Sequence, residues 1–170
     1  MWEFKGQKRP AFADEPAEGQ ESVWDYPRPP AIVAADHTVR VESGSLLVAR
    51  SDNAKRVLET ASPPSYYLPP DDVAEGVLVA VPGQSFCEWK GSASYWALAE
   101  DPSAAPVAFS YETPTRAFES IRGYLGFYPG RLECFVGDER VRPQPGGFYA
   151  GWITDSIAGP VKGEPGTGHW

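Results

Sequence analysis

Alternation of apolar and polar residues dominates two stretches of the chain and predicts β-hairpins. In TVRVESGSLLVARS (38–51) the alternation continues on both sides of Ser-Gly, which favours a tight turn. RLECFVGDERVRP (131–143) repeats this pattern around Gly-Asp. Short apolar runs typical of further strands are GVLVAVP (76–82), SYWALA (94–99) and PVAFSYE (106–112). The pattern therefore predicts a fold that is mainly β.

In two other segments the apolar residues are spaced with the period of an α-helix. SDNAKRVLET (51–60) begins with candidate N-cap residues, and its apolar side chains fall on one helical face. TRAFESIRGYLGFYPG (115–130) places Phe118, Ile121 and Leu125 on one face before a glycine-rich end. We therefore predict one or two short helices beside the strands.

The two ends of the chain differ from its centre. Residues 1–21 are polar and rich in Pro, Gly and Glu, which predicts a mobile N-terminal arm. Residues 22–143 form the predicted β-rich domain. Residues 144–170 are dense in glycine, yet they keep large apolar side chains that a disordered linker rarely carries. We expect this Gly/aromatic-rich tail to pack on the domain, and the alternative is that it caps a partner.

Composition and charge narrow the classes of function. A chain of 170 residues suits one domain, and 15 basic against 23 acidic residues leave a net charge of −8. Such a charge repels phosphate backbones, so we expect no nucleic-acid partner. The chain has no apolar run long enough for a signal peptide or a membrane span. We therefore expect no membrane partner. Cys87 and Cys134 are the only cysteines, too few for a disulfide scaffold, and this predicts a cytoplasmic protein.

The first stretch with candidate chemistry is PPSYYLPP (63–70). Its prolines fix the backbone, so Tyr66 and Tyr67 are held in a defined geometry. Rigid rings with hydroxyl tips make good walls for a binding site. The alternative is that one ring fills the core while the other points to solvent.

The second stretch is FCEWKGSASYW (86–96), in which small residues separate Lys90 from Tyr95 and Trp96. They leave room for a ligand or another backbone to approach. Cys87 is a candidate nucleophile if Lys90 lowers the pKa of its thiol, and the alternative is that Cys87 is a small buried apolar residue.

Glu59 lies at the C-terminal end of the first predicted helix, where the helix dipole disfavours a carboxylate. This position predicts a compensating cation, either Lys90 or Lys55 one helical turn earlier. The candidate catalytic residues are therefore Glu59, Cys87 and Lys90. The only histidines, His37 and His169, have no neighbours at metal-ligating spacing, so we expect no metal and no cofactor.

Four motifs, WDYPRPP, VLETASPPSYYLPPDDV, CEWKGSASYW and IRGYLGFYP, occur in this order. Over about residues 22–143 they resemble the bacterial and fungal family known as domain of unknown function 427 (DUF427). The resemblance implies a compact β-tent, or Mss4-like, domain similar to those of methionine sulfoxide reductase B and cereblon. Those relatives hold zinc between CxxC pairs, which this chain lacks, so a metal is not carried over.

The family is sometimes labelled a nucleotidyltransferase, but the Gly-Ser and DxD-type carboxylates of that activity are missing. The positions that match the family's motifs imply a pocket lined by Glu59, Tyr66, Tyr67, Cys87, Lys90, Tyr95 and Trp96. Our preferred hypothesis is that this pocket binds a small polar ligand, to which Lys90 offers a positive charge and Glu59 a carboxylate. The alternatives are an enzyme using the same pocket, a protein-interaction module, and ordinary core packing of these aromatic residues.

Overall fold

The computed structural model describes residues 2–170, which form short strands and three single-turn or two-turn 3-10 helices. The strands are β1 (Glu21–Ser22), β2 (Ala31–Ala34), β3 (Val39–Ser43), β4 (Leu46–Ser51), β5 (Lys55–Leu58), β6 (Ser65–Leu68), β7 (Leu78–Cys87), β8 (Gly91–Leu98), β9 (Ala108–Ser110), β10 (Leu125–Phe127), β11 (Glu133–Val136), β12 (Glu139–Arg140), β13 (Arg142–Pro143), β14 (Trp152–Ile153) and β15 (Ile157–Ala158). The helices are η1 (Val23–Asp25), η2 (Pro70–Asp72) and η3 (Arg116–Ile121). The prediction of a mainly β fold with only short helices is confirmed.

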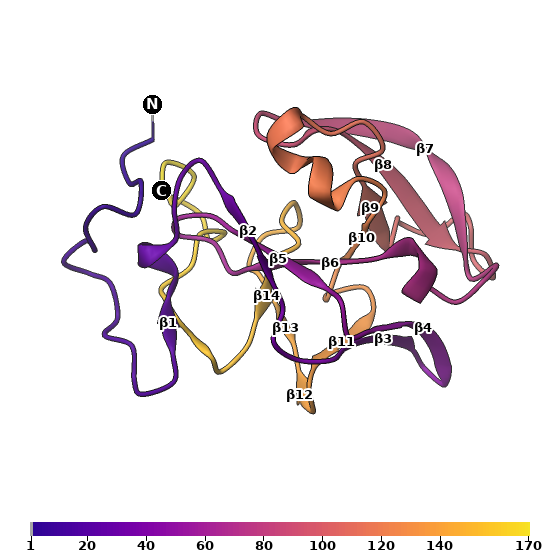
Figure 1. The fold of residues 1–170 in the computed structure, drawn as a ribbon, viewed down its shortest axis with the longest axis horizontal. Coiled ribbons are helices and arrows are strands. Elements are labelled where there is room, and N and C mark those ends of the chain that lie inside the picture. The colour runs from indigo at the N-terminus through magenta and orange to yellow at the C-terminus, as the bar shows by residue number, and fades with distance from the viewer. Residues whose placement is uncertain (1) are drawn as a thin grey trace.

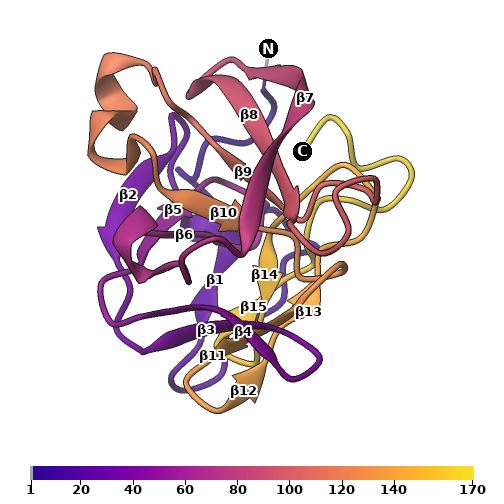
Figure 2. The same ribbon diagram turned by 90° about the vertical axis from the view of Figure 1, so that its right-hand side faces the viewer.

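Two sheets carry most of the structure. The larger has seven strands in the order β2-β5-β6-β10-β9-β8-β7, and the smaller has four in the order β12-β11-β3-β4. Figures 1 and 2 both show the β7–β8 hairpin at the top and the four-stranded sheet at the bottom. The short pairs β1-β15 and β13-β14 tie the C-terminal tail to earlier parts of the chain. Among residues 2–170, no helix has the length and apolar character needed to cross a membrane.

Both predicted hairpins are present. Strands β3 and β4 pair antiparallel and turn at Gly44, and β11 and β12 turn at Gly137. Both glycines have a φ near +60°, a conformation that costs glycine little because it has no Cβ. The inward side chains of the first hairpin, Val39, Val41 and Val48, are fully buried. The period-2 pattern therefore identified the core face of this hairpin correctly.

The helix predicted over 51–60 is wrong. Residues 55–58 form β5 instead, which pairs with β2 on one side and β6 on the other. Ser51 Oγ does accept the main-chain N–H of Asn53, as a capping residue would, but the chain then enters a strand. Pairing on both sides satisfies the β5 main chain, and these tertiary bonds outweigh a weak local helix preference.

The second predicted helix is present but short. Its first turns form η3, in which Phe118 and Ile121 are buried on one face as expected. Leu125, placed on the same helical face by the sequence pattern, belongs to β10 instead. The chain leaves the helix at Gly123, whose φ is +73°.

The seven-stranded sheet separates two apolar clusters. One fills the space between the two sheets and includes Val41, Leu68 and Phe127. The other lies on the opposite face, where Tyr67 and Phe109 pack with residues of η3. Because successive side chains of a strand point to opposite faces, neighbours in β6 and β9 contribute to different clusters.

The two ends of the chain contact one another and the domain. Phe4 and Phe12 of the arm each lie edge-on against Trp24, with ring centroids 5.2 Å apart. Phe12 also stacks on Trp170 of the tail at 5.1 Å. Figure 1 accordingly shows the N- and C-terminal segments on the same side of the molecule.

Gly126 allows β10 to pass beneath an aromatic ring. It pairs with Phe109 of β9, and a Cβ at this position would overlap the ring, lying 2.7 Å from Phe109 Cε2. We expect Gly126→Ala to lower the free energy of unfolding by about 1–3 kcal/mol because the packed ring must shift. Urea denaturation measures the effect.

Gly130→Ala is the matched control. Its added Cβ would meet Pro143 Cβ at 3.5 Å, which is ordinary van der Waals contact. Both substitutions remove the same flexibility from the unfolded chain, so their difference isolates the clash with Phe109. Equal urea midpoints for the two variants would contradict the prediction.

Candidate functional site

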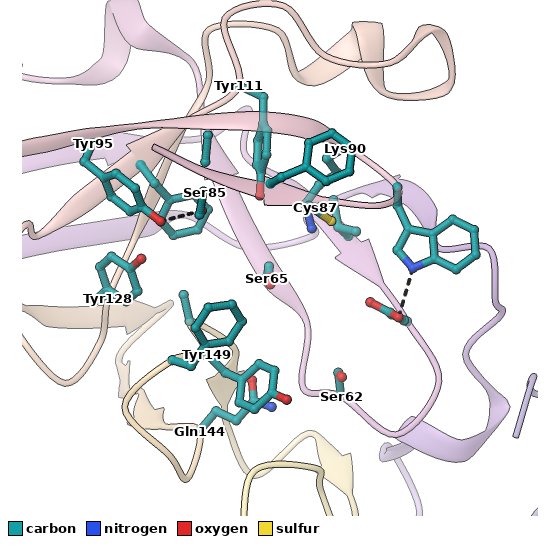
Figure 3. A pocket seen from close by; sticks show the side chains of 18 of the residues that line it. Ser62, Ser65, Ser85, Cys87, Lys90, Tyr95, Tyr111, Tyr128, Gln144 and Tyr149 are labelled. Atoms are coloured by element: carbon teal, nitrogen blue, oxygen red, sulfur yellow. Dashed lines mark hydrogen bonds between the residues drawn. The ribbon is translucent and has the colours of Figure 1, made fainter. Parts of the chain in front are cut away.

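A cavity of about 680 Å³ lies on the face of the seven-stranded sheet that carries Tyr67 and Phe109. Strands β5 to β9, the β7–β8 turn and the tail form its walls. Figure 3 shows Tyr111, Lys90 and Cys87 on one side and Tyr149 and Gln144 across from them. Cavities of this size accommodate small organic molecules.

Strand β7 bends around this cavity. The register with β8 shifts between Val81 and Gln84, so Pro82 and Gly83 have no partner on β8. Gly83 adopts a φ of +115°, which favours glycine. Beyond this bulge, Ser85 and Cys87 reach the cavity from one edge of the sheet.

The structure separates each neighbouring pair of predicted aromatic residues. Tyr67 and Tyr95 line the cavity, together with the predicted Glu59, Cys87 and Lys90. Tyr66 lies on the opposite face of β6 and stacks on Trp152 at 4.7 Å. Trp96 also turns away from the cavity and donates from Nε1 to Ser110 Oγ at 2.9 Å. Adjacent residues of a strand cannot face the same side.

Glu59 is held by a buried cation from an earlier part of the chain. Its Oε1 accepts from Arg28 Nε at 3.1 Å and from Trp89 Nε1 at 3.3 Å. The Arg28 side chain is only 1% exposed and also donates to the main-chain oxygens of Phe4 and Thr60. Glu59 therefore holds an internal cation in place.

The predicted partners of Glu59, Lys90 and Lys55, are not its ion-pair partners. Since residues 55–58 form a strand, Lys55 is not one helical turn from Glu59, and its Nζ donates to Ser120 O at 2.7 Å. Lys90 Nζ lies 5.5 Å from the centroid of the Tyr111 ring. Within residues 2–170 its ammonium has no carboxylate partner, so its charge is available to the cavity.

The two thiols lie in different sheets and are both free. Cys87 is half-buried at the end of β7 and lines the cavity beside Lys90 (Figure 3). Cys134 is buried in β11, and this burial raises the pKa of its thiol to about 12. At neutral pH Cys134 is therefore a protonated core residue.

Tyrosine hydroxyl groups supply much of the cavity's polar lining. Burial raises the pKa of Tyr67 and Tyr111, and it raises that of Tyr128 to about 12. All three are therefore neutral at physiological pH and can donate a hydrogen bond. The Tyr95 hydroxyl is paired with Ser85 Oγ at 2.5 Å. Those of Tyr67 and Tyr111 have no hydrogen-bond partner within the described chain, and neither is fully buried.

Sequence reasoning missed two of these residues and the contribution of the tail. Tyr111 could have been found, because the alternation in PVAFSYE places it on the same face as Phe109. Tyr128 follows β10 and lies in the IRGYLGFYP motif, but the helix predicted over 115–130 concealed the strand alternation that places it on the face of Phe109. Gln144 and Lys162 of the tail also line the cavity, and Gln144 Nε2 donates to Lys162 O at 2.7 Å.

Within residues 2–170, no three His, Cys, Asp or Glu side chains are close enough together to form a metal site. A family model described as "Domain of unknown function (DUF427)" matches residues 31–138. The matched range includes Glu59, Lys90 and the β7–β8 hairpin, whereas Arg28 and Lys162 lie outside it. A search of curated proteins finds no match.

Proposed function

The chain belongs to the DUF427 family, and we propose that its cavity binds a small polar ligand. The observation that carries this proposal is the set of unpaired polar groups in one aromatic-walled hollow. The hydroxyls of Tyr67 and Tyr111 and the ammonium of Lys90 all border the cavity without a hydrogen-bonding partner in the described chain. Among the described residues, the Tyr26 hydroxyl is the one side-chain polar atom that is fully buried without a partner, so these groups are open to the cavity, where a ligand can take the place of water.

The cavity walls favour a ligand with a flat portion. Phe109 and Tyr128 lie side by side with ring centroids 5.2 Å apart, and Tyr67 meets Phe109 edge-on at 5.9 Å. Their rings would pack against a planar group, while the neutral hydroxyls donate to its acceptors. Glu59 Oε1 is occupied by Arg28 and Trp89, which leaves Oε2 to accept from the ligand.

The enzyme hypothesis has weaker support. Cys87 and Lys90 line the same cavity, but a nucleophile is activated by a base that is itself held in position. Among the described residues, the Cys87 thiol has no hydrogen-bonded acid or base. Binding is therefore the function that this geometry supports best.

A thermal-shift screen against nucleotides, amino acids, sugars and other small metabolites tests the proposal. A compound present at 100 times its Kd stabilises a protein by about 2.7 kcal/mol, which raises the melting temperature measurably. We expect Tyr67→Phe to weaken binding of that compound about fivefold, since one hydrogen bond contributes about 1 kcal/mol. Lys90→Ala should weaken binding of an anionic compound further.

Tyr66→Phe is the control for Tyr67→Phe, because the neighbouring ring lies on the opposite face of the same strand. It should leave the affinity unchanged. The proposal fails if no compound shifts the melting temperature, or if Tyr67→Phe binds as tightly as the wild type.

A further inference from the structure

The β7–β8 turn holds a thiol and an ammonium at the cavity. Cys87 ends β7, and Lys90 immediately precedes β8. Thr115 fixes the turn between them, because its Oγ1 donates to Trp89 O at 2.6 Å and its N–H donates to Lys90 O at 3.1 Å. The Trp89 side chain is fixed as well, since its Nε1 donates to Glu59 Oε1 at 3.3 Å. Figure 3 shows the thiol and the ammonium on the same side of the cavity, so a well-anchored turn presents both groups to it.

Two phenol groups border the same cavity. Tyr67 and Tyr111 are only 1% and 6% exposed, and their ring centroids lie 6.4 Å apart. Neither hydroxyl has a hydrogen-bond partner within residues 2–170, and neither is fully buried, so both open into the cavity. Burial raises the pKa of both tyrosines, and the nearby thiol of Cys87 acts in the same direction. Independently of the thiol, these two neutral donors call for an acceptor on a ligand.

The groups that surround the thiol limit the chemistry that it can carry out. Displacement at an ester or thioester expels a leaving group and uses a positioned acid or base. Conjugate addition to an unsaturated ketone must deliver a proton to carbon, which also uses a positioned acid. Within residues 2–170, no acid or base is hydrogen-bonded to the Cys87 thiol. A reaction that needs neither group fits this site better.

Addition of the thiol to an aldehyde meets this condition. Cys87 Sγ forms a bond to the carbonyl carbon while the π bond between carbon and oxygen breaks, and the thiol proton ends on that oxygen. No atom leaves, and nothing is oxidised or reduced. The oxygen is negative until the proton arrives, and the hydroxyls of Tyr67 and Tyr111 together with the charge of Lys90 would stabilise it there.

We propose that the ligand is an aromatic aldehyde, which Cys87 binds reversibly as a thiohemiacetal. The inference rests on the proposed function, and it specifies both the class of ligand and the bond that holds it. Phe109 and Tyr128 line the same cavity with ring centroids 5.2 Å apart, and they would pack against the ring of the aldehyde. The reaction is reversible and has no second product, so it captures a ligand and does not turn one over.

Aldehydes and their alcohols test the inference. The probes are benzaldehyde and 4-nitrobenzaldehyde, each compared with its benzyl alcohol by isothermal titration calorimetry at pH 7.5 in buffer free of thiols and amines. Wild-type protein should bind at least one aldehyde about tenfold or more tightly than its alcohol. In Cys87→Ala this preference should disappear. Tyr111→Phe should reduce the preference about fivefold, since it removes one hydrogen bond to the oxygen.

Cys134→Ala is the control for Cys87→Ala. Cys134 is buried in β11 and does not line the cavity, so its removal should leave the preference for the aldehyde as it is in the wild type. If Cys134→Ala loses the preference as Cys87→Ala does, the effect comes from a general loss of structure and the assignment to Cys87 fails.

A direct measurement on wild-type protein covers the case in which a variant fails to fold. With an aldehyde labelled with ¹³C at the carbonyl carbon, the NMR signal of the bound ligand should move from the carbonyl region to that of a saturated carbon bonded to oxygen and sulfur. Dilution should return it. A signal in the region of a carbon–nitrogen double bond, made permanent by borohydride, would place the bond on a lysine such as Lys90 and overturn the assignment to Cys87.

The inference is wrong if aldehydes and alcohols bind equally, if Cys87→Ala keeps the preference, or if the carbonyl signal does not move. The proposed function survives each of these results, provided that another compound raises the melting temperature and loses affinity with Tyr67→Phe. If no compound of any class binds, both proposals fail.

Discussion

Replacing Trp152 with alanine is expected to lower the free energy of unfolding by about 3–5 kcal/mol, the range observed when a large aromatic residue is removed from a core. Trp152 belongs to the tail but is only 1% exposed and packs in the cluster between the two sheets. The substitution removes the stacking of Trp152 on Tyr66 and the hydrogen bond of 3.0 Å that Trp152 Nε1 donates to Phe127 O. Urea and thermal denaturation measure the loss.

The control comes from the same glycine-rich segment. Phe148 is 76% exposed, so Phe148→Ala should change the free energy of unfolding by less than about 0.5 kcal/mol. If Trp152→Ala unfolds at the wild-type urea midpoint, the tail does not unfold together with the domain. A lower free energy of unfolding for Trp152→Ala, with that of Phe148→Ala unchanged, would support the prediction that the tail packs on the domain.

Glu59→Gln is expected to destabilise the fold by about 3 kcal/mol, because removing the carboxylate leaves the charge of the buried Arg28 uncompensated. Arg28 would keep its bonds to Phe4 O and Thr60 O but lose its carboxylate. It would also remain near the positive charge of Lys162, and both cations contact the Trp2 ring. Chemical denaturation at neutral pH measures this effect.

Glu88→Gln is the control for Glu59→Gln. Glu88 also borders the cavity, but it is exposed and has no ion-pair partner in the described chain. Its substitution should therefore leave the stability within about 0.5 kcal/mol of the wild type. If the two variants are equally stable, Glu59 is not a structural anchor and its carboxylate is free for another role.

Local patterns predicted the elements that depend on local contacts. The alternation over 38–51 and 131–143 specified both hairpins, because their turns and their pairing lie within one short segment. The 51–60 segment is different, since β5 owes its conformation to β2 and β6 on either side. A ten-residue pattern cannot contain that information.

The same limit applies to the candidate site. Three of the residues chosen from the family's motifs, Glu59, Tyr67 and Lys90, line one cavity. The same choice included Tyr66 and Trp96, whose side chains lie on the opposite face of the sheet because of strand alternation. Applying the alternation to each strand would have separated these pairs. By contrast, the partner of Glu59 is 31 positions away in the sequence, and no local pattern specifies such a contact.

The bulge at Pro82 and Gly83 has a consequence for aggregation. Strand β7 spans 10 residues at an edge of the seven-stranded sheet, and exposed edges recruit strands from other molecules. Proline has no N–H to offer, and the bulge interrupts the regular row of donors and acceptors. A foreign strand could therefore pair only with the short stretches on either side. The bend that shapes the cavity wall also keeps this long edge from acting as a template for aggregates.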